Sequence, residues 1–192
     1  TYGCCFGLDF KKNDSLFVLF EKAMAQAELV SHPISQIIDA FQGKSIFIVA
    51  HSLGTRVAVQ SLNYSINNSS DIRVGLIAAA IPRSLIVDGY RQNTLKSNIR
   101  WMVYYNEKDF ALLKKDNKIG LLGPGAYTHG VTTLGCNKNH DAKKLIVDLS
   151  QYSPKIHLQL VNMNHIGKCH SLRCYTNGVD LNPIWEFFTL NE

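Results

Sequence analysis

The sequence predicts an α/β fold with a doubly wound, mostly parallel sheet and helices on both faces. Apolar runs rich in β-branched residues recur along the chain, and amphipathic patterns typical of helices lie between them. Continuous apolar runs are typical of strands buried on both faces, as in a parallel sheet. No repeat or low-complexity tract breaks the alternation, and 192 residues suit one sizeable core. We therefore expect residues 1–192 to form a single domain.

The chain opens with a predicted strand and a helical region. The strand is "TYGCCFGLDF", residues 1–10. Asp14 or Ser15 then offers an N-cap for a helix. Pro33 is expected to interrupt that helix, because proline lacks the backbone N–H, and a second helical stretch is expected to end at Gly43.

Four more strands are predicted: "SIFIVA" (45–50), "RVGLIAAAI" (73–81), "IRWMVYY" (99–105) and "KIHLQLVNM" (155–163). The first is expected to be buried on both faces, and the alternating pattern of the last favours a sheet edge. A helix is expected from Gly54 to about Tyr64, and a closing helix near Pro183. Parallel α/β sheets carry their chemistry at the carboxyl ends of the strands, so candidate site residues are sought there.

Charge and composition argue against several classes of function. The net charge of +5 is mild, and Asp116 breaks up the lysines at 114, 115 and 118, so nucleic-acid binding is not favoured. No stretch reaches the length of a membrane span, and no spacing requires a metal or an organic cofactor. The sequence leaves the oligomeric state open.

The five cysteines predict free thiols rather than a disulfide framework. No C-x-x-C pair occurs, Cys169 and Cys174 lack a second ligand pair at zinc-site spacing, and Cys4 and Cys5 lie in an apolar context. This pattern favours a reducing compartment such as the cytoplasm.

Ser52 lies in "IVAHSLGTRV" (48–57), between a predicted strand and a predicted helix. A reversal this sharp forces the residue at its tip into a strained backbone conformation and exposes the hydroxyl. Ala50 and Gly54, two positions to either side, are expected to be pressed together, which would explain why both are small. The alternatives are a helix N-cap or a phosphate-binding turn, although the latter usually needs more glycines.

The segment "VAHSLGTRVAVQSL" resembles the nucleophile elbow of α/β-hydrolases in the lipase- and esterase-like branch. The segment "RWMVYYNEKDFAL" resembles the acid-bearing loop of poorly characterised bacterial hydrolases of that superfamily. The resemblance implies an α/β-hydrolase-like sheet that lacks the N-terminal strands. It also implies a serine hydrolase that cleaves a carboxylic ester, with triad residues in the order Ser, acid, His.

Asp109 fits the acid, because it follows the predicted strand 99–105 and precedes "FALL"; Glu107 and Asp88 are the alternatives. Of the seven histidines, His170 and His165 lie between the last predicted strand and the closing helix, where the superfamily carries its base. We favour His170 because of its longer reach and its "CHS" context, and His165 remains the alternative.

In the implied reaction, the histidine takes the Ser52 proton, Ser52 attacks an acyl carbonyl, and the Leu53 N–H helps hold the oxyanion. A second oxyanion donor normally follows an earlier strand, often near a His-Gly pair, and no His-Gly pair precedes Ser52. The upstream candidates for this donor lie around residues 1–10. This gap is the main argument for an alternative function, a catalytically weak or inactive hydrolase fold used for binding. Residues 82–96 and 121–135 are either covers over the site, which would favour an apolar acyl or short lipid ester, or plain connections.

Overall fold

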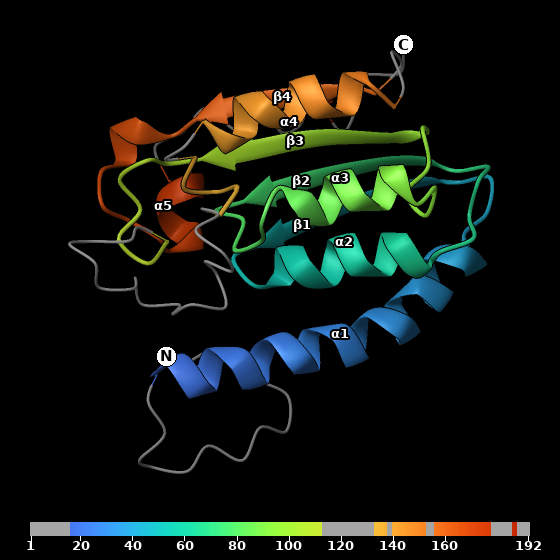
Figure 1. Cartoon of the computed structure of the whole chain (residues 1–192), viewed down its shortest axis with the longest axis horizontal. Coiled ribbons are helices and arrows are strands. Elements are labelled where there is room, and N and C mark those ends of the chain that lie inside the picture. The colour runs from blue at the N-terminus through green and yellow to red at the C-terminus, as the bar shows by residue number, and fades with distance from the viewer. Residues whose placement is uncertain (1–15, 113–132, 138–139, 153–155, 178–185, 188–192) are drawn as a thin grey trace.

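The computed structural model describes residues 16–112, 133–137, 140–152, 156–177 and 186–187. Within these residues the chain forms one four-stranded sheet in the order β1-β2-β3-β4, and every neighbouring pair is parallel (Figure 1). The strands are β1 (Ser45–His51), β2 (Asp71–Ile77), β3 (Ile99–Tyr105) and β4 (Leu158–Asn162). The helices are α1 (Leu16–Ala40), α2 (Gly54–Tyr64), α3 (Ser84–Arg91), α4 (Asp141–Ser150), α5 (Leu172–Thr176) and the 3₁₀ turn η3 (Asn164–Ile166).

The predicted α/β class is confirmed, because an all-parallel sheet is flanked by helices. Helices α1 to α4 contribute to one apolar core with alternate residues of β2 and β3, such as Val74 and Trp101. The intervening residues of those strands, including Met102, belong to a second core that contains Tyr175 of α5. Since successive strand residues face opposite sides, α5 covers the other face of the sheet.

Strand β1 differs from the prediction of a strand buried on both faces. Phe47 and Val49 are 51% and 55% exposed, whereas Ala50 is buried. The strand lies at one edge of the described sheet. Ile46 and Ile48 pack against the core that α1 and α2 share, whereas Phe47 and Val49 on the other face stay about half exposed. Strand β4 forms the opposite edge, as its alternating pattern predicted.

Pro33 does not interrupt the first helix, contrary to the prediction. Helix α1 runs without a break from Leu16 to Ala40 with Pro33 inside it. Its packing against α2 and the burial of side chains such as Ala27 and Ile38 offset the lost backbone hydrogen bond.

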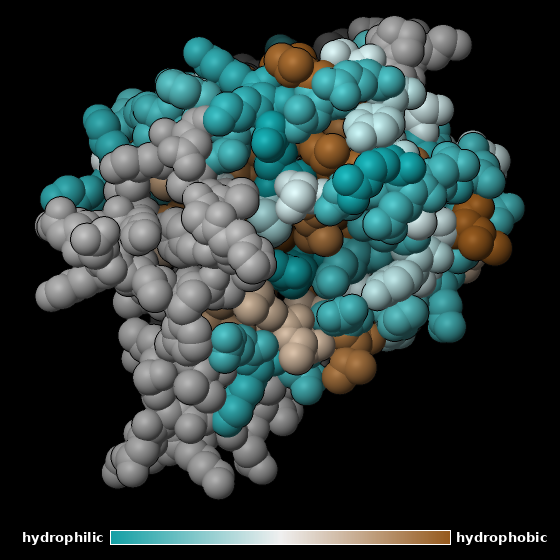
Figure 2. Space-filling model, in the orientation of Figure 1, coloured by the Kyte–Doolittle hydropathy of each residue, from teal (hydrophilic) through white to brown (hydrophobic). Residues whose placement is uncertain are grey.

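Residues 82–96 form a core helix and its connections rather than a cover over the site. Ile86 and Tyr90 of α3 are buried in the same core as α2 and α4. On the side shown in Figure 2, apolar residues form separate patches in a mainly hydrophilic surface.

Several predicted features lie outside the described residues. They are the first strand (1–10), the helix cap at Asp14 or Ser15, most of the closing helix and residues 121–132 of the second proposed cover. Residues 133–135 are described, and they pack beside the ends of β2 and β3: Gly135 N–H donates to the Ala79 carbonyl, and Asn106 N–H donates to the Gly135 carbonyl.

Candidate active site

Ser52 follows the carboxyl end of β1 and has a positive φ of 53°. Few residues with a side chain adopt this left-handed conformation, and it carries a strain that the surrounding structure must offset. Two backbone hydrogen bonds hold the turn in place. Ser52 N–H donates to the Ile77 carbonyl over 2.9 Å, and Ala80 N–H donates to the Ser52 carbonyl over 3.3 Å. The predicted strain at Ser52 is therefore present, and the neighbouring strand β2 supports it.

The Ser52 hydroxyl does not cap α2. The residue before the helix is Leu53, in right-handed helical conformation and with no side-chain cap. Instead, Ser52 Oγ lies 2.8 Å from Nε2 of His170. The explanation for a small residue at Gly54 was wrong, because a Cβ built there meets no atom within 4 Å. Helix α2 leaves the turn with its first residue exposed, so Gly54 is not pressed against Ala50.

His170 lies in the loop between η3 and α5, and both ring nitrogens have partners. Nδ1 lies 2.8 Å from Asp109 Oδ2, and Nε2 lies 2.8 Å from Ser52 Oγ. A carboxylate only accepts, so Nδ1 carries the proton and Nε2 accepts from the serine hydroxyl. This tautomer can take a proton from Ser52.

Asp109 follows β3 and is 0% exposed. Its Oδ1 accepts from the N–H groups of Ala111 and Leu112, at 3.0 and 3.3 Å. Its Oδ2 accepts from His170 and, at 3.1 Å, from the Tyr175 hydroxyl. These four donors compensate the carboxylate for the loss of water.

Tyr175 supplies a donor to the acid that the sequence analysis missed. Burial, together with the nearby Asp109 carboxylate, raises the pKa of Tyr175 well above its ordinary value of 10.0. The phenol therefore stays neutral and keeps its proton for Asp109. A tyrosine after a predicted loop carries no sequence signal for this contact.

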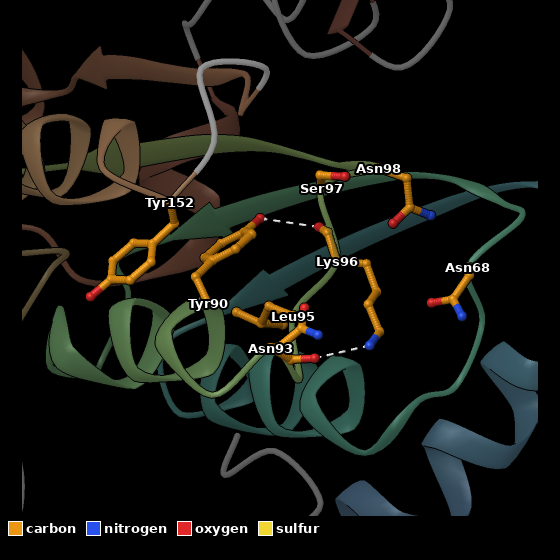
Figure 3. Close-up of a pocket in the computed structure, with 8 residues that line it drawn as sticks. All are labelled: Asn68, Tyr90, Asn93, Leu95, Lys96, Ser97, Asn98 and Tyr152. Carbon is orange, nitrogen blue, oxygen red and sulfur yellow. Dashed lines mark hydrogen bonds between the residues drawn. The ribbon is translucent and has the colours of Figure 1, made fainter.

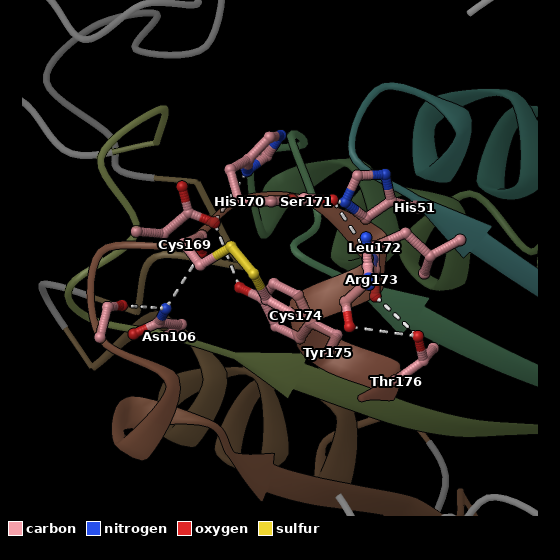
Figure 4. The surroundings of a disulfide bond; sticks show 12 residues. His51, Asn106, Cys169, His170, Ser171, Leu172, Arg173, Cys174, Tyr175 and Thr176 are labelled. Carbon is pink, nitrogen blue, oxygen red and sulfur yellow. Dashed lines mark hydrogen bonds and ion pairs between the residues drawn. A yellow bond between two sulfur atoms is a disulfide. The ribbon is translucent and has the colours of Figure 1, made fainter. Parts of the chain in front are cut away.

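His51 also contacts the His170 loop. Its Nε2 lies 2.8 Å from the carbonyl oxygen of His170, and since a carbonyl only accepts, His51 is the donor (Figure 4). Burial is the main cause that lowers the pKa of His51 below 6.5. His51 is therefore neutral, carries its proton on Nε2, and donates that proton to the backbone carbonyl of His170.

The alternative acids and base lie elsewhere. Glu107 accepts from the amides of Asn137 and Asn164, and Asp88 pairs with Arg91 on the surface. His165 is exposed in η3. Among the candidates of the sequence analysis, the structure brings together Ser52, His170 and Asp109.

The oxyanion donors are described only in part. Among the described residues, no group accepts from the Leu53 N–H, which lies at the start of the turn into α2. The segment in which a second donor was sought, residues 1–10, lies outside the described residues.

The prediction that Cys169 and Cys174 are free thiols was wrong. The two form a disulfide that spans His170 (Figure 4). The Asn106 side chain donates to the carbonyls of Gly167 and Cys169, at 2.7 and 3.3 Å, and so ties the same loop to the end of β3. The spacing of the two cysteines around a candidate histidine was the available sequence signal for this loop.

A separate pocket of about 430 Å³ lies at the amino-terminal end of the strands, away from Ser52 (Figure 3). Its lining is largely polar and consists of Asn68, Tyr90, Asn93, Leu95, Lys96, Ser97, Asn98 and Tyr152. Tyr90 accepts a hydrogen bond from the Trp101 indole, and burial raises the pKa of Tyr90 to about 12. Lys96 donates to the Asn93 carbonyl. The side chains of Tyr90 and Lys96 are therefore both hydrogen-bonded to other groups of the protein.

Within the described ranges, no group of three or more His, Cys, Asp or Glu side chains is placed to hold a metal ion. No helix in the same part of the chain is long and apolar enough to cross a membrane. Comparison with protein-family models, with curated proteins and with solved structures finds no match. Fold and site together define an α/β protein with a parallel sheet and a Ser-His-Asp cluster at the carboxyl ends of its strands.

Proposed function

We propose that the protein is a serine hydrolase that cleaves carboxylic esters through Ser52, His170 and Asp109. The observation that carries the proposal is the continuous hydrogen-bonded chain from Ser52 Oγ through both nitrogens of His170 to the buried Asp109 carboxylate. This arrangement activates an alcohol that is otherwise a weak nucleophile.

Each group has a defined task in the proposed reaction. His170 Nε2 takes the proton as Ser52 Oγ attacks the acyl carbonyl, and the resulting imidazolium lies beside Asp109. The Leu53 N–H donates to the developing oxyanion. The imidazolium returns its proton to the departing alcohol, and a water molecule activated by His170 then releases the acyl group from Ser52.

Exposed apolar side chains that neighbour triad residues in the sequence favour an apolar acyl group or a short lipid ester as substrate. Phe110 directly follows Asp109, Leu172 comes two residues after His170, and both are exposed. Leu53 joins the second apolar core from the serine side. An acyl chain placed among such residues would bury apolar surface that is otherwise exposed to water, which favours binding.

The test is hydrolysis of p-nitrophenyl acetate and butyrate together with labelling by a fluorophosphonate. We expect the label on Ser52, and we expect Ser52→Ala to lose at least about a thousandfold in turnover and to remain unlabelled. Ser150→Ala is the matched control, because Ser150 is exposed at the end of α4 and, among the described residues, its hydroxyl donates to the Val147 carbonyl of its own helix.

Two histidine variants test the base. His170→Gln is expected to lose turnover, whereas His165→Gln keeps it, because only His170 contacts Ser52. If the folded protein shows neither label nor turnover, the alternative function as a binding module on an inactive hydrolase fold replaces this proposal.

A further inference from the structure

The Cys169–Cys174 disulfide joins the loop that carries His170 to the helix that carries Tyr175. Cys169 directly precedes His170, and Cys174 directly precedes Tyr175 in α5. His170 and Tyr175 both donate to the same oxygen, Oδ2 of Asp109. The sulfur bridge, which Figure 4 shows between Cys169 and Cys174, therefore links the backbones of two residues that donate to the same oxygen.

We propose that this disulfide positions His170 for catalysis and that its reduction by a dithiol slows ester hydrolysis. The proposal rests on the function proposed above and adds a mode of regulation to it. Cys169 and Cys174 act here through His170 and do not touch the substrate.

The remaining restraints on the loop are non-covalent. The His51 imidazole donates to the His170 carbonyl, and the Asn106 amide donates to the carbonyls of Gly167 and Cys169. Gly167 begins the loop with a φ of 69°, a conformation that its lack of a side chain permits. Without the disulfide, the loop keeps these hydrogen bonds but gains conformational freedom, so His170 spends less time within reach of Ser52.

The bridge is accessible to a reductant. Cys169 and Cys174 are both partly exposed, whereas Cys136 is buried. The exposed cationic residues Lys168 and Arg173 lie next to them in the chain. Nearby positive charge favours both the attacking and the departing thiolate in thiol–disulfide exchange.

The redox step requires a dithiol as co-reactant. One thiolate of the dithiol attacks a sulfur of the bridge and forms a mixed disulfide, and the second thiolate resolves it. The Cys169–Cys174 bond breaks and both sulfurs gain a proton. The dithiol loses two electrons and two protons and becomes a cyclic disulfide.

The experiment compares the full chain after air oxidation with the same chain after treatment with dithiothreitol. Alkylation and peptide mass spectrometry verify the state of Cys169 and Cys174. We expect kcat for p-nitrophenyl butyrate to fall about tenfold on reduction with little change in KM, because substrate binding does not depend on the His170 position. Reoxidation is expected to restore kcat.

Two variants separate this bridge from the other cysteines. The double variant Cys169→Ser with Cys174→Ser is expected to have the kcat of the reduced chain even without reductant. Its kcat should not change when dithiothreitol is added. A triple variant, Cys4→Ser with Cys5→Ser and Cys136→Ala, should keep the response. Thermal unfolding of each sample shows that the assay temperature lies below its transition, so a fall in kcat does not reflect loss of the fold.

A spectroscopic signature reports the same event without an ester substrate. A proton shared between His170 Nδ1 and Asp109 gives a low-field proton resonance, which is assigned by its absence in His170→Gln. We expect this resonance in the oxidised chain and its weakening after reduction. Equal kcat and an equal resonance in both redox states would overturn the inference while leaving the hydrolase intact. Absence of Ser52 labelling in the oxidised chain would overturn the proposed function, and the inference with it.

Discussion

Burial sets the protonation states of the single residues around the Ser52 hydroxyl. Tyr175 remains a neutral donor because its pKa is raised, and His51 remains a neutral donor because its pKa is lowered. The same physical cause moves the two pKa values in opposite directions, since burial penalises a phenolate and an imidazolium alike. Both residues thereby keep a proton for the hydrogen bonds that hold Asp109 and His170.

The lowered pKa of His51 predicts a pH dependence of stability. Below 6.5 the unfolded chain binds a proton at His51 that the folded chain does not yet bind, so the free energy of unfolding falls as the pH drops from 6.5 through the folded pKa. Well above pH 6.5 His51 is neutral in both the folded and the unfolded chain, so it adds no further pH dependence to the free energy of unfolding. The variant His51→Gln keeps an N–H donor for the His170 carbonyl but does not titrate.

Denaturant unfolding between pH 7.5 and 5.5 measures this contribution. We expect a shallower pH dependence of the unfolding free energy in His51→Gln than in the unsubstituted chain. Identical slopes for the two proteins would show that His51 titrates alike in the folded and unfolded states.

At the scale of secondary structure, residues 133–137 lie against the carboxyl ends of β2 and β3. The Gly135 N–H donates to the carbonyl of Ala79, which follows β2, and the Gly135 carbonyl accepts from the N–H of Asn106, which follows β3. Asn106 in turn holds the His170 loop. This short segment therefore connects the ends of two strands to the loop that carries the candidate base.

The close approach at Gly135 predicts a large cost for a side chain there. A Cβ in Gly135→Ala would overlap backbone atoms of Ala78 and Ala79, which cannot rotate away. We expect the free energy of unfolding to fall by about 2–4 kcal/mol, as for other overpacked sites. Gly54→Ala is the control, because its Cβ meets nothing within 4 Å, and we expect a change below about 1 kcal/mol. Equal effects in urea unfolding would contradict the packing argument.

At the scale of the whole molecule, a buried arginine links distant parts of the chain on the second face of the sheet. Arg73 of β2 is 2% exposed and pairs with Asp71 at 2.9 Å. It also donates to the Phe187 carbonyl at 2.8 Å, and its guanidinium lies over the Phe47 ring. One side chain thus joins an edge strand, a central strand and a residue near the C-terminus.

Removing that arginine is expected to destabilise the fold. Arg73→Leu removes the guanidinium that pairs with Asp71 Oδ2 and donates to the Phe187 carbonyl, while Arg100 still pairs with Asp71 Oδ1. We therefore expect a loss of about 1–3 kcal/mol in the free energy of unfolding. Arg91→Ala removes an exposed pair with Asp88 and is expected to cost less than about 0.5 kcal/mol. If guanidinium unfolding gives similar losses for both, the buried network does not contribute as described.

Local patterns in the sequence were sufficient for the four described strands and for the helix α2. The predicted strand at 99–105 and the helix at 54–64 have the bounds found in the structure, because their apolar periodicity is strong. The strand at 73–81 ends earlier, at Ile77, since Ala78 adopts a positive φ and leaves the ladder. Pro33 was misjudged because packing against α2 outweighs a local preference.

The sequence by itself determined the α/β class and the serine at a strand-to-helix turn, because both depend on patterns among neighbouring residues. Only the tertiary structure decided which histidine meets Ser52, which side chains of β1 stay partly exposed among the described residues, and that Tyr175, His51 and a disulfide surround the candidate base. His170 is separated from Ser52 by 118 positions and from Asp109 by 61. Contacts over such separations arise from the packing of strands and loops, and no local pattern encodes them.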